Sequence, residues 1–120
     1  MTSHSRRLVL LIAILTLAST ALFADVTSEV KGQLKYGVRA AREAHWDEAI
    51  YRWRRVLQLD PKNLMAHNNL AVAYEQTGDY QMALEEYELA YRLDSGNQYV
   101  KNNLDRFKDF YKKYRRYNNQ

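Results

Sequence analysis

Two histidines and two pairs of adjacent carboxylates are the side chains in this sequence that could support acid–base catalysis or hold a metal ion. His45 and His67 lie far apart, and neither has other ligand-type residues at the short spacings that zinc sites use. Asp47–Glu48 and Glu85–Glu86 are neighbours in sequence, and consecutive residues of a helix point to different sides. Neither pair is therefore arranged to act on one reacting atom, and both are interpreted as solvated surface.

The residue types exclude further classes of chemistry. The chain has 120 residues and no cysteine, which removes disulfides, thiolate metal ligands and thiol nucleophiles together. It also has no glycine-rich phosphate-binding loop and no serine in a nucleophile motif. We therefore expect no catalytic residue, no cofactor and no metal ion, and we predict that the chain is not an enzyme. Binding through a surface remains as the way in which the chain can function.

Five helices that could present such a surface are predicted from apolar residues that recur at spacings of three and four. Their ranges are 28–44, 46–58, 64–77, 80–93 and 98–117. Thr27 or Ser28 is expected to cap the first helix, Pro61 to end the second, and Gly78 to supply the left-handed turn after the third. Residues 118–120 are expected to form a disordered tail. The chain is thus predicted to be all-α.

The sequence repeats itself at an offset of 34 residues. The matching pairs are Ala49 with Ala83, Ile50 with Leu84, Trp53 with Tyr87, Val56 with Ala90, Leu59 with Leu93 and Asp60 with Asp94. Asn102-Asn103-Leu104 copies Asn68-Asn69-Leu70 at the same offset, so the last predicted helix begins a third unit. A fixed period of this length is typical of helical repeat arrays, which stack helix pairs and offer extended binding surfaces.

These repeating residues resemble the tetratricopeptide repeat (TPR). The second unit carries the family pattern at Leu70, Ala71, Tyr74, Gly78-Asp79-Tyr80, Ala83, Tyr87 and Ala90. The first unit matches at Gly37, Ala49, Trp53 and Asp60-Pro61, and it departs at Tyr36, Ala40, Ala44 and Val56. The resemblance implies a TPR-type α-solenoid with two helix-turn-helix repeats, over residues 30–63 and 64–97, and a capping helix over 98–117. Together they form one TPR domain over residues 27–117.

The resemblance also implies a concave groove, lined by the first helix of each pair, that takes a peptide segment of another protein. The lining positions in this sequence are Leu34, Val38, Arg42, Met65, Asn68, Asn69, Val72, Gln76, Tyr99, Asn103 and Arg106. One subtype of the family grips a C-terminal carboxylate with two Lys, one Arg and two Asn, and only Asn69 matches that set. The carboxylate-binding function is therefore not carried over. The groove is predicted to be neutral to apolar, suited to an extended or helical segment.

The last predicted helix has an inner stripe and two aromatic residues outside it. The stripe consists of Val100, Leu104, Phe107, Tyr111 and Tyr114, and we expect it to pack on the helices at 64–77 and 80–93. Phe110 and Tyr117 lie off the stripe, where they either pack in part or form a contact patch for a second copy or another protein. Basic residues are interleaved with tyrosines between 111 and 117, which suits an acidic partner, a cell-wall polymer or anionic lipid.

Residues 1–24 have the pattern of a secretory signal: a basic start, the apolar run Leu8–Leu17, and small residues up to Ala24. Cleavage after Ala24, or at Ser19-Thr20-Ala21 as a second option, would give an exported protein, periplasmic or secreted. Nucleic acid is then not an expected partner. If the segment is retained, the uncharged stretch Leu8–Ala24 is at the short end of the roughly 17–25 residues that span a bilayer. The protein would then be anchored in the inner membrane, and membrane contact is expected only in that case.

The expected function is that of a non-catalytic adaptor in a bacterial cell envelope, which binds another protein through the concave groove and the C-terminal helix. Two alternatives remain open. One is a structural subunit that assembles into a dimer or filament by repeat stacking, and the other is a membrane-anchored TPR module.

Overall fold

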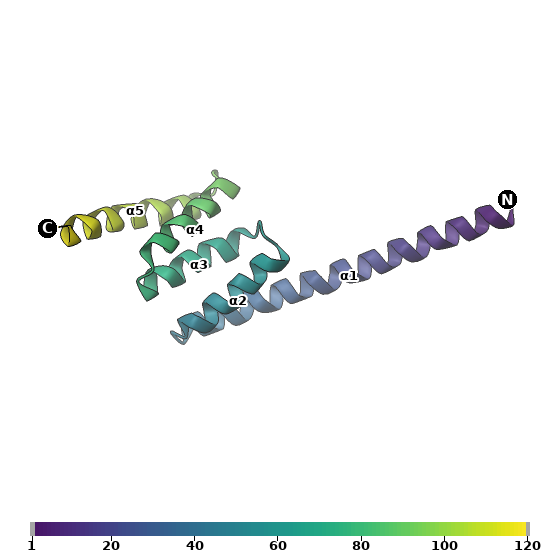
Figure 1. Ribbon diagram of the computed structural model, residues 1–120, viewed down its shortest axis with the longest axis horizontal. Coiled ribbons are helices and arrows are strands. Elements are labelled where there is room, and N and C mark those ends of the chain that lie inside the picture. The colour runs from purple at the N-terminus through teal and green to yellow at the C-terminus, as the bar shows by residue number, and fades with distance from the viewer. Residues whose placement is uncertain (1, 120) are drawn as a thin grey trace.

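Five α-helices follow one another in alternating directions over residues 2–119, which are the residues that the computed structural model describes. The helices are α1 (Ser3–Arg42), α2 (Trp46–Leu59), α3 (Leu64–Thr77), α4 (Tyr80–Leu93) and α5 (Gln98–Asn118). Each helix packs on its neighbours along the chain, most closely within the pairs α1–α2 and α3–α4, and these pairs stack with α5 at the end (Figure 1). The molecule measures 81 × 30 × 22 Å, and the first half of α1 projects from the stack as a rod.

The start of α1 differs from the prediction of a helix that begins near Ser28. The helix begins at Ser3 and runs without a break, with Thr2 as its N-cap. Thr27 lies inside it, and its hydroxyl donates to the carbonyl of Phe23 (2.9 Å) instead of capping a new helix. The physical reason is the composition of this stretch, because no glycine or proline precedes Gly32 to interrupt the backbone ladder.

The end of α1 is set by a turn that uses an alanine where the family pattern has glycine. Ala44 has φ of 59°, in the left-handed region, and Arg42 is the last helical residue. An L-residue in this conformation costs roughly 1–2 kcal/mol. The equivalent turn after α3 uses Gly78 with φ of 84°, where no side chain opposes the conformation.

The hydrophobic core is built from the positions that repeat in the sequence. Ala49, Trp53 and Val56 of α2 are buried, and so are their counterparts in α4: Ala83, Tyr87 and Ala90. The first repeat depends on one close approach between helices, because a Cβ added to Gly37 would lie 2.3 Å from Nε1 of Trp53. Glycine at this position lets α1 lie directly against the indole of α2.

The inner stripe of α5 is buried over about its first three turns and becomes exposed toward its end. Val100, Leu104 and Phe107 are buried, Tyr111 is half-buried, and Tyr114 is 41% exposed. The stripe packs chiefly along α4 rather than equally on α3 and α4. Tyr114 lies at the N-terminal end of α4, where its ring centroid is 4.7 Å from that of Tyr80, the first residue of that helix.

The C-terminal end of α5 is longer than predicted. The helix continues through Asn118, and Asn119 is its C-cap, with a backbone N–H that donates to the carbonyls of Arg115 and Tyr117. No glycine or proline follows Gly96, so the α-helical ladder has no reason to stop earlier. Of the predicted disordered tail at 118–120, Gln120 lies outside the described residues.

Candidate protein-binding groove

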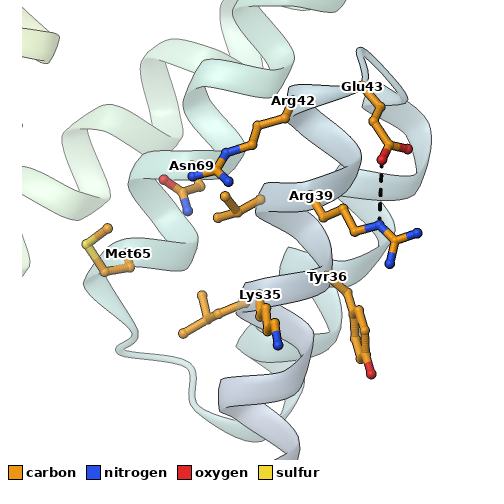
Figure 2. A pocket seen from close by; sticks show the side chains of 9 residues that line it. Lys35, Tyr36, Arg39, Arg42, Glu43, Met65 and Asn69 are labelled. Carbon is orange, nitrogen blue, oxygen red and sulfur yellow. Dashed lines mark ion pairs between the residues drawn. The ribbon is translucent and has the colours of Figure 1, made fainter.

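A hollow of about 690 Å³ lies between α1 and α3, the first helices of the two repeats. Its lining consists of Leu34, Lys35, Tyr36, Val38, Arg39, Arg42 and Glu43 from α1 and its end, and Met65 and Asn69 from α3 (Figure 2). Five of the predicted groove residues are therefore brought together: Leu34, Val38, Arg42, Met65 and Asn69.

The floor of this groove is apolar. Leu34 and Val38 are half-buried and pack against the core with one side, and Met65 is 50% exposed. These side chains offer apolar surface to a partner without being part of the sealed core. The exposed thioether of Met65 suits such a surface, because methionine is flexible and adapts to different apolar neighbours.

The rim of the groove is cationic, which differs from the predicted neutral-to-apolar character. Lys35, Arg39 and Arg42 line it, and Arg42 extends from α1 toward Asn69 of α3 (Figure 2). The one carboxylate in the lining, Glu43, lies 3.5 Å from Arg39, and both side chains are more than half exposed. Lys35 and Arg39 were missed by sequence analysis. Their spacing of four, followed by three to Arg42, was the available signal, because it places all three on one side of a helix.

Asn68 and Asn103 contact each other instead of facing this groove. The Asn103 amide donates to Oδ1 of Asn68 (3.0 Å) and so connects α5 to α3. Asn68 is fully buried, and its Nδ2 has no hydrogen-bond partner within the described residues. Both residues thus hold the two helices together at a position where sequence analysis predicts partner contact.

Arg106 is also held by the protein itself. Its guanidinium donates two hydrogen bonds to the carboxylate of Glu75 (2.7 and 2.8 Å), and the hydroxyl of Tyr87 donates to the same carboxylate (3.0 Å). The hydrogen bond from Arg106 lowers the pKa of Glu75, against the opposing effect of burial. Burial and the Glu75 charge raise the pKa of Tyr87. This network joins α5 to both helices of the second repeat.

The remaining predicted residues do not share the α1–α3 groove. Val72 is half-buried against the core, while Gln76 and Tyr99 are exposed on α3 and α5. Phe110 is 39% exposed and packs edge-on against Tyr80 at 5.1 Å, so it belongs partly to an aromatic cluster. Tyr117 is 79% exposed. The predicted set is therefore divided between one groove and the far end of the stack.

Two of the three histidines, His67 and His45, are held by contacts within the protein. His67 is buried, with Nδ1 2.6 Å from Glu86 and Nε2 2.9 Å from the carbonyl of Pro61. His45 is exposed at the turn after α1, 3.4 Å from Glu43. Within residues 2–119, no three His, Cys, Asp or Glu side chains come together in a way that could hold a metal ion.

Antiparallel helix pairs in register, with a groove between their first helices, are the architecture of a TPR-type helical repeat protein. More particularly, the chain belongs to the family described as "Domain of unknown function (DUF6340)", whose model matches residues 35–119. This match covers most of the first repeat, the whole second repeat and α5.

One relative and one solved structure, both described as containing the TPR, are similar to this chain. The chain is 32% identical over 79 residues to the tetratricopeptide repeat domain-containing protein PYG7, chloroplastic, of Arabidopsis thaliana. The match covers 66% of this chain and 26% of that protein, so the chain spans about a quarter of the relative's length. The C-terminal TPR-containing domain of an FK506-binding protein of Plasmodium falciparum superposes with a TM-score of 0.72 at 23% identity, over 79% of this chain and 63% of that one. The structural likeness confirms the fold.

Proposed function

We propose that this chain is a non-catalytic adaptor that binds a segment of another protein in the groove between α1 and α3. One observation carries the proposal: the hollow of about 690 Å³ is open between the first helices of two stacked repeats, and its floor is apolar. Pockets of about 300–1,000 Å³ with apolar walls and a few polar groups are the usual form of a binding site. TPR proteins generally bind other proteins, which makes a protein segment the expected occupant.

The lining defines what such a segment would carry. An apolar side chain would bury against Leu34, Val38 and Met65, where each Å² removed from water contributes about 25 cal/mol. Carboxylates beside it would lie near Arg39 and Arg42, which form charge-assisted hydrogen bonds with acidic groups. The partner segment is therefore apolar at its centre and acidic at its edges.

The proposed place of action is the cell envelope, on the exported side of a membrane. What supports it is the apolar half of α1, which has the composition of a signal or an anchor. Alkaline phosphatase fused to the C-terminus of the full chain tests the location, because the enzyme is active only outside the cytoplasm. An inactive fusion that is present in normal amount would contradict export.

Self-assembly by stacking of a second copy on α5 has less support. The face of α5 on which a further helix would pack carries Lys101, Asp105 and Lys108, and their charges would have to be desolvated. Sedimentation of the full chain in detergent, over a range of protein concentrations, tests this alternative. A concentration-dependent dimer would favour it.

The groove is tested with a pair of matched charge reversals in the full chain. Arg39→Glu with Arg42→Glu changes the rim of the groove, and Lys112→Glu with Arg116→Glu changes α5 by the same charge. Both are solvent-exposed pairs, so neither is expected to alter folding. Partner proteins that co-purify from native membranes are quantified by mass spectrometry for each variant.

We expect the amount of co-purified partner protein to fall at least tenfold for the groove variant and to stay unchanged for the α5 variant. Leu34→Asp, which places a carboxylate on the apolar floor, should have the same effect as the groove pair. If the groove variants retain their partners and the α5 variant loses them, binding occurs at the far end of the stack and the proposal is wrong.

A further inference from the structure

The apolar half of α1, residues Leu8–Ala24, contacts no other helix within the described residues. Consecutive large side chains there are exposed on all sides of the helix, from 53% at Val9 to 77% at Phe23. This helix is the one in the described chain that is long and apolar enough to cross a membrane, and its apolar window is 0% buried. A helix that is hydrophobic all round needs cover on every side, and a lipid bilayer provides it.

We propose that α1 is an uncleaved membrane anchor, whose helix runs unbroken from the bilayer into the first repeat and holds the groove at a fixed height above the membrane. The proposed anchor does not depend on the proposed binding function. Only the claim that the height of the groove above the membrane matters for binding rests on that function.

The length and internal hydrogen bonds of the segment fit a bilayer. At about 1.5 Å per residue, Leu8–Ala24 is roughly 26 Å long, close to the ~30 Å thickness of the hydrocarbon region. The hydroxyls of Thr16, Ser19 and Thr20 each donate to a backbone carbonyl one turn earlier, at 2.8–2.9 Å. Each hydroxyl proton is therefore satisfied within the helix, as the lipid interior requires.

The region where a signal peptidase would cut is helical and joins the repeat directly. The helix is continuous through Ala18–Asp25, whereas proteolysis favours exposed, irregular segments. Packing of the first repeat begins at once after Asp25, because Val26 is half-buried and Glu29 pairs with Arg55 of α2 at 2.8 Å. No loop therefore separates the apolar segment from the folded domain, and exposing a cleavage site would require unwinding the helix.

An unbroken helix sets the geometry of the whole molecule relative to the membrane. Lys35 and Arg42 follow Ala24 along the same helix, at a rise of roughly 16 and 27 Å beyond the apolar segment. The C-terminus of α5 lies at the opposite end of the long axis from the start of α1 (Figure 1). The basic and aromatic end of α5 is thus turned away from the bilayer that holds α1.

The absence of cysteine makes a direct test possible in the full chain, because single cysteines can be introduced and labelled alone. Ile12→Cys and Ile14→Cys lie about 200° apart around the helix, and Arg42→Cys is the aqueous control. Each variant is labelled with a fluorophore and reconstituted into vesicles of phosphatidylcholine and phosphatidylglycerol. Quenching is compared between a lipid-soluble and a water-soluble quencher.

For a spanning helix, both Ile12→Cys and Ile14→Cys labels should be shielded from the aqueous quencher, at least tenfold relative to Arg42→Cys. If one of the two is as accessible to water as Arg42→Cys, the helix lies flat on the surface and the proposal is wrong. The intact mass of the chain from native membranes should include the apolar segment. A mass that corresponds to a start at Asp25 would overturn the proposal directly.

The rigid connection has its own test. A flexible Gly-Ser-Gly-Ser insertion between Asp25 and Val26 should leave the protein in the membrane but widen the distribution of distances between an Arg42→Cys label and the bilayer. An unchanged distribution would overturn the fixed height. The Arg39→Glu, Arg42→Glu variant should still be membrane-embedded, so failure of the groove proposal and failure of the anchor proposal are distinguishable.

Discussion

Helices α3 and α5 carry equivalent residues in the same register, yet α3 lies inside the stack and α5 ends it. Both helices are capped by an asparagine, Asn63 and Asn97, whose side chain accepts from the backbone N–H three residues on. Three equivalent pairs are buried in both helices: Ala66 with Val100, Leu70 with Leu104, and Ala73 with Phe107. The face that packs on the preceding helix is therefore the same in each.

The two helices differ on an adjacent face, about 100° further around the helix. In α3 it consists of His67, Ala71 and Tyr74, which are buried against the rest of the array. The equivalent residues of α5 are Lys101, Asp105 and Lys108; Lys101 pairs with Asp105, and Lys108 lies 3.2 Å from Glu88. This second face is thus buried in α3, where other helices cover it, and charged in α5, where no later helix covers it within the described residues.

The largest expected effect comes from giving α3 a residue of α5. Ala71→Asp would place a carboxylate at a fully buried position without a partner, and we expect a loss of at least about 4 kcal/mol in the free energy of unfolding. The matched control is Asp105→Ala, which removes an exposed carboxylate and should change stability by less than about 1 kcal/mol. Urea unfolding of the full chain in detergent, followed by circular dichroism, measures both. Equal effects would show that the two faces are not different.

The buried face that α5 has in common with α3 is tested with two aromatic residues of α5, one buried and one partly exposed. Phe107 is fully buried, so Phe107→Ala should leave a cavity and cost about 3–4 kcal/mol. Phe110 is 39% exposed, and Phe110→Ala should cost less than half as much. The same unfolding experiment gives both values. A small effect of Phe107→Ala would mean that α5 does not cover α4.

Ala71 of α3 and Asp105 of α5 occupy the same repeat position. In α1 this position is occupied by Gly37. Gly37→Ala places a methyl group 2.3 Å from Nε1 of Trp53, and the resulting overpacking should cost about 1–3 kcal/mol. The double variant with Trp53→Phe, which removes the part of the ring that clashes, should recover part of this loss. Failure of the rescue would show that the close approach does not limit this position.

The smallest effect concerns the contact that ties α5 to α3. The hydrogen bond from Arg106 lowers the pKa of Glu75, so the pair stabilises the folded protein above the ordinary carboxyl pKa of 4.5. This contribution is lost as the pH falls through the lowered pKa of the folded state. We expect about 1 kcal/mol, since Arg106 is half exposed and water screens the pair. Unfolding curves between neutral and acidic pH should therefore converge for the wild type and Glu75→Gln.

Much of the fold could be predicted because it depends on local patterns. The boundaries of α2, α3 and α4 follow from apolar spacing and from Pro61 and Gly78, and the repeat offset identifies which positions are buried. The start of α1 was predicted wrongly because the apolar segment and the first repeat were treated as separate. Without glycine or proline between them, one backbone ladder joins both.

The candidate site was predicted only in part. Leu34, Val38 and Met65 could be assigned to the groove, since they follow from repeat register. Asn68 and Arg106 were assigned to the same surface, but contacts between α3 and α5 pair Asn68 with Asn103 and Arg106 with Glu75. Repeat register predicts which side of the helix a residue lies on. It does not predict which side chain of another helix forms a hydrogen bond with that residue.

By itself the sequence determined the helices, the repeat and the identity of the core, because each depends on residues a few positions apart. Tertiary structure decided which polar side chains remain free to meet a partner. That outcome depends on contacts such as Arg106 with Glu75, which join residues on different helices and form only when the stack brings those helices together.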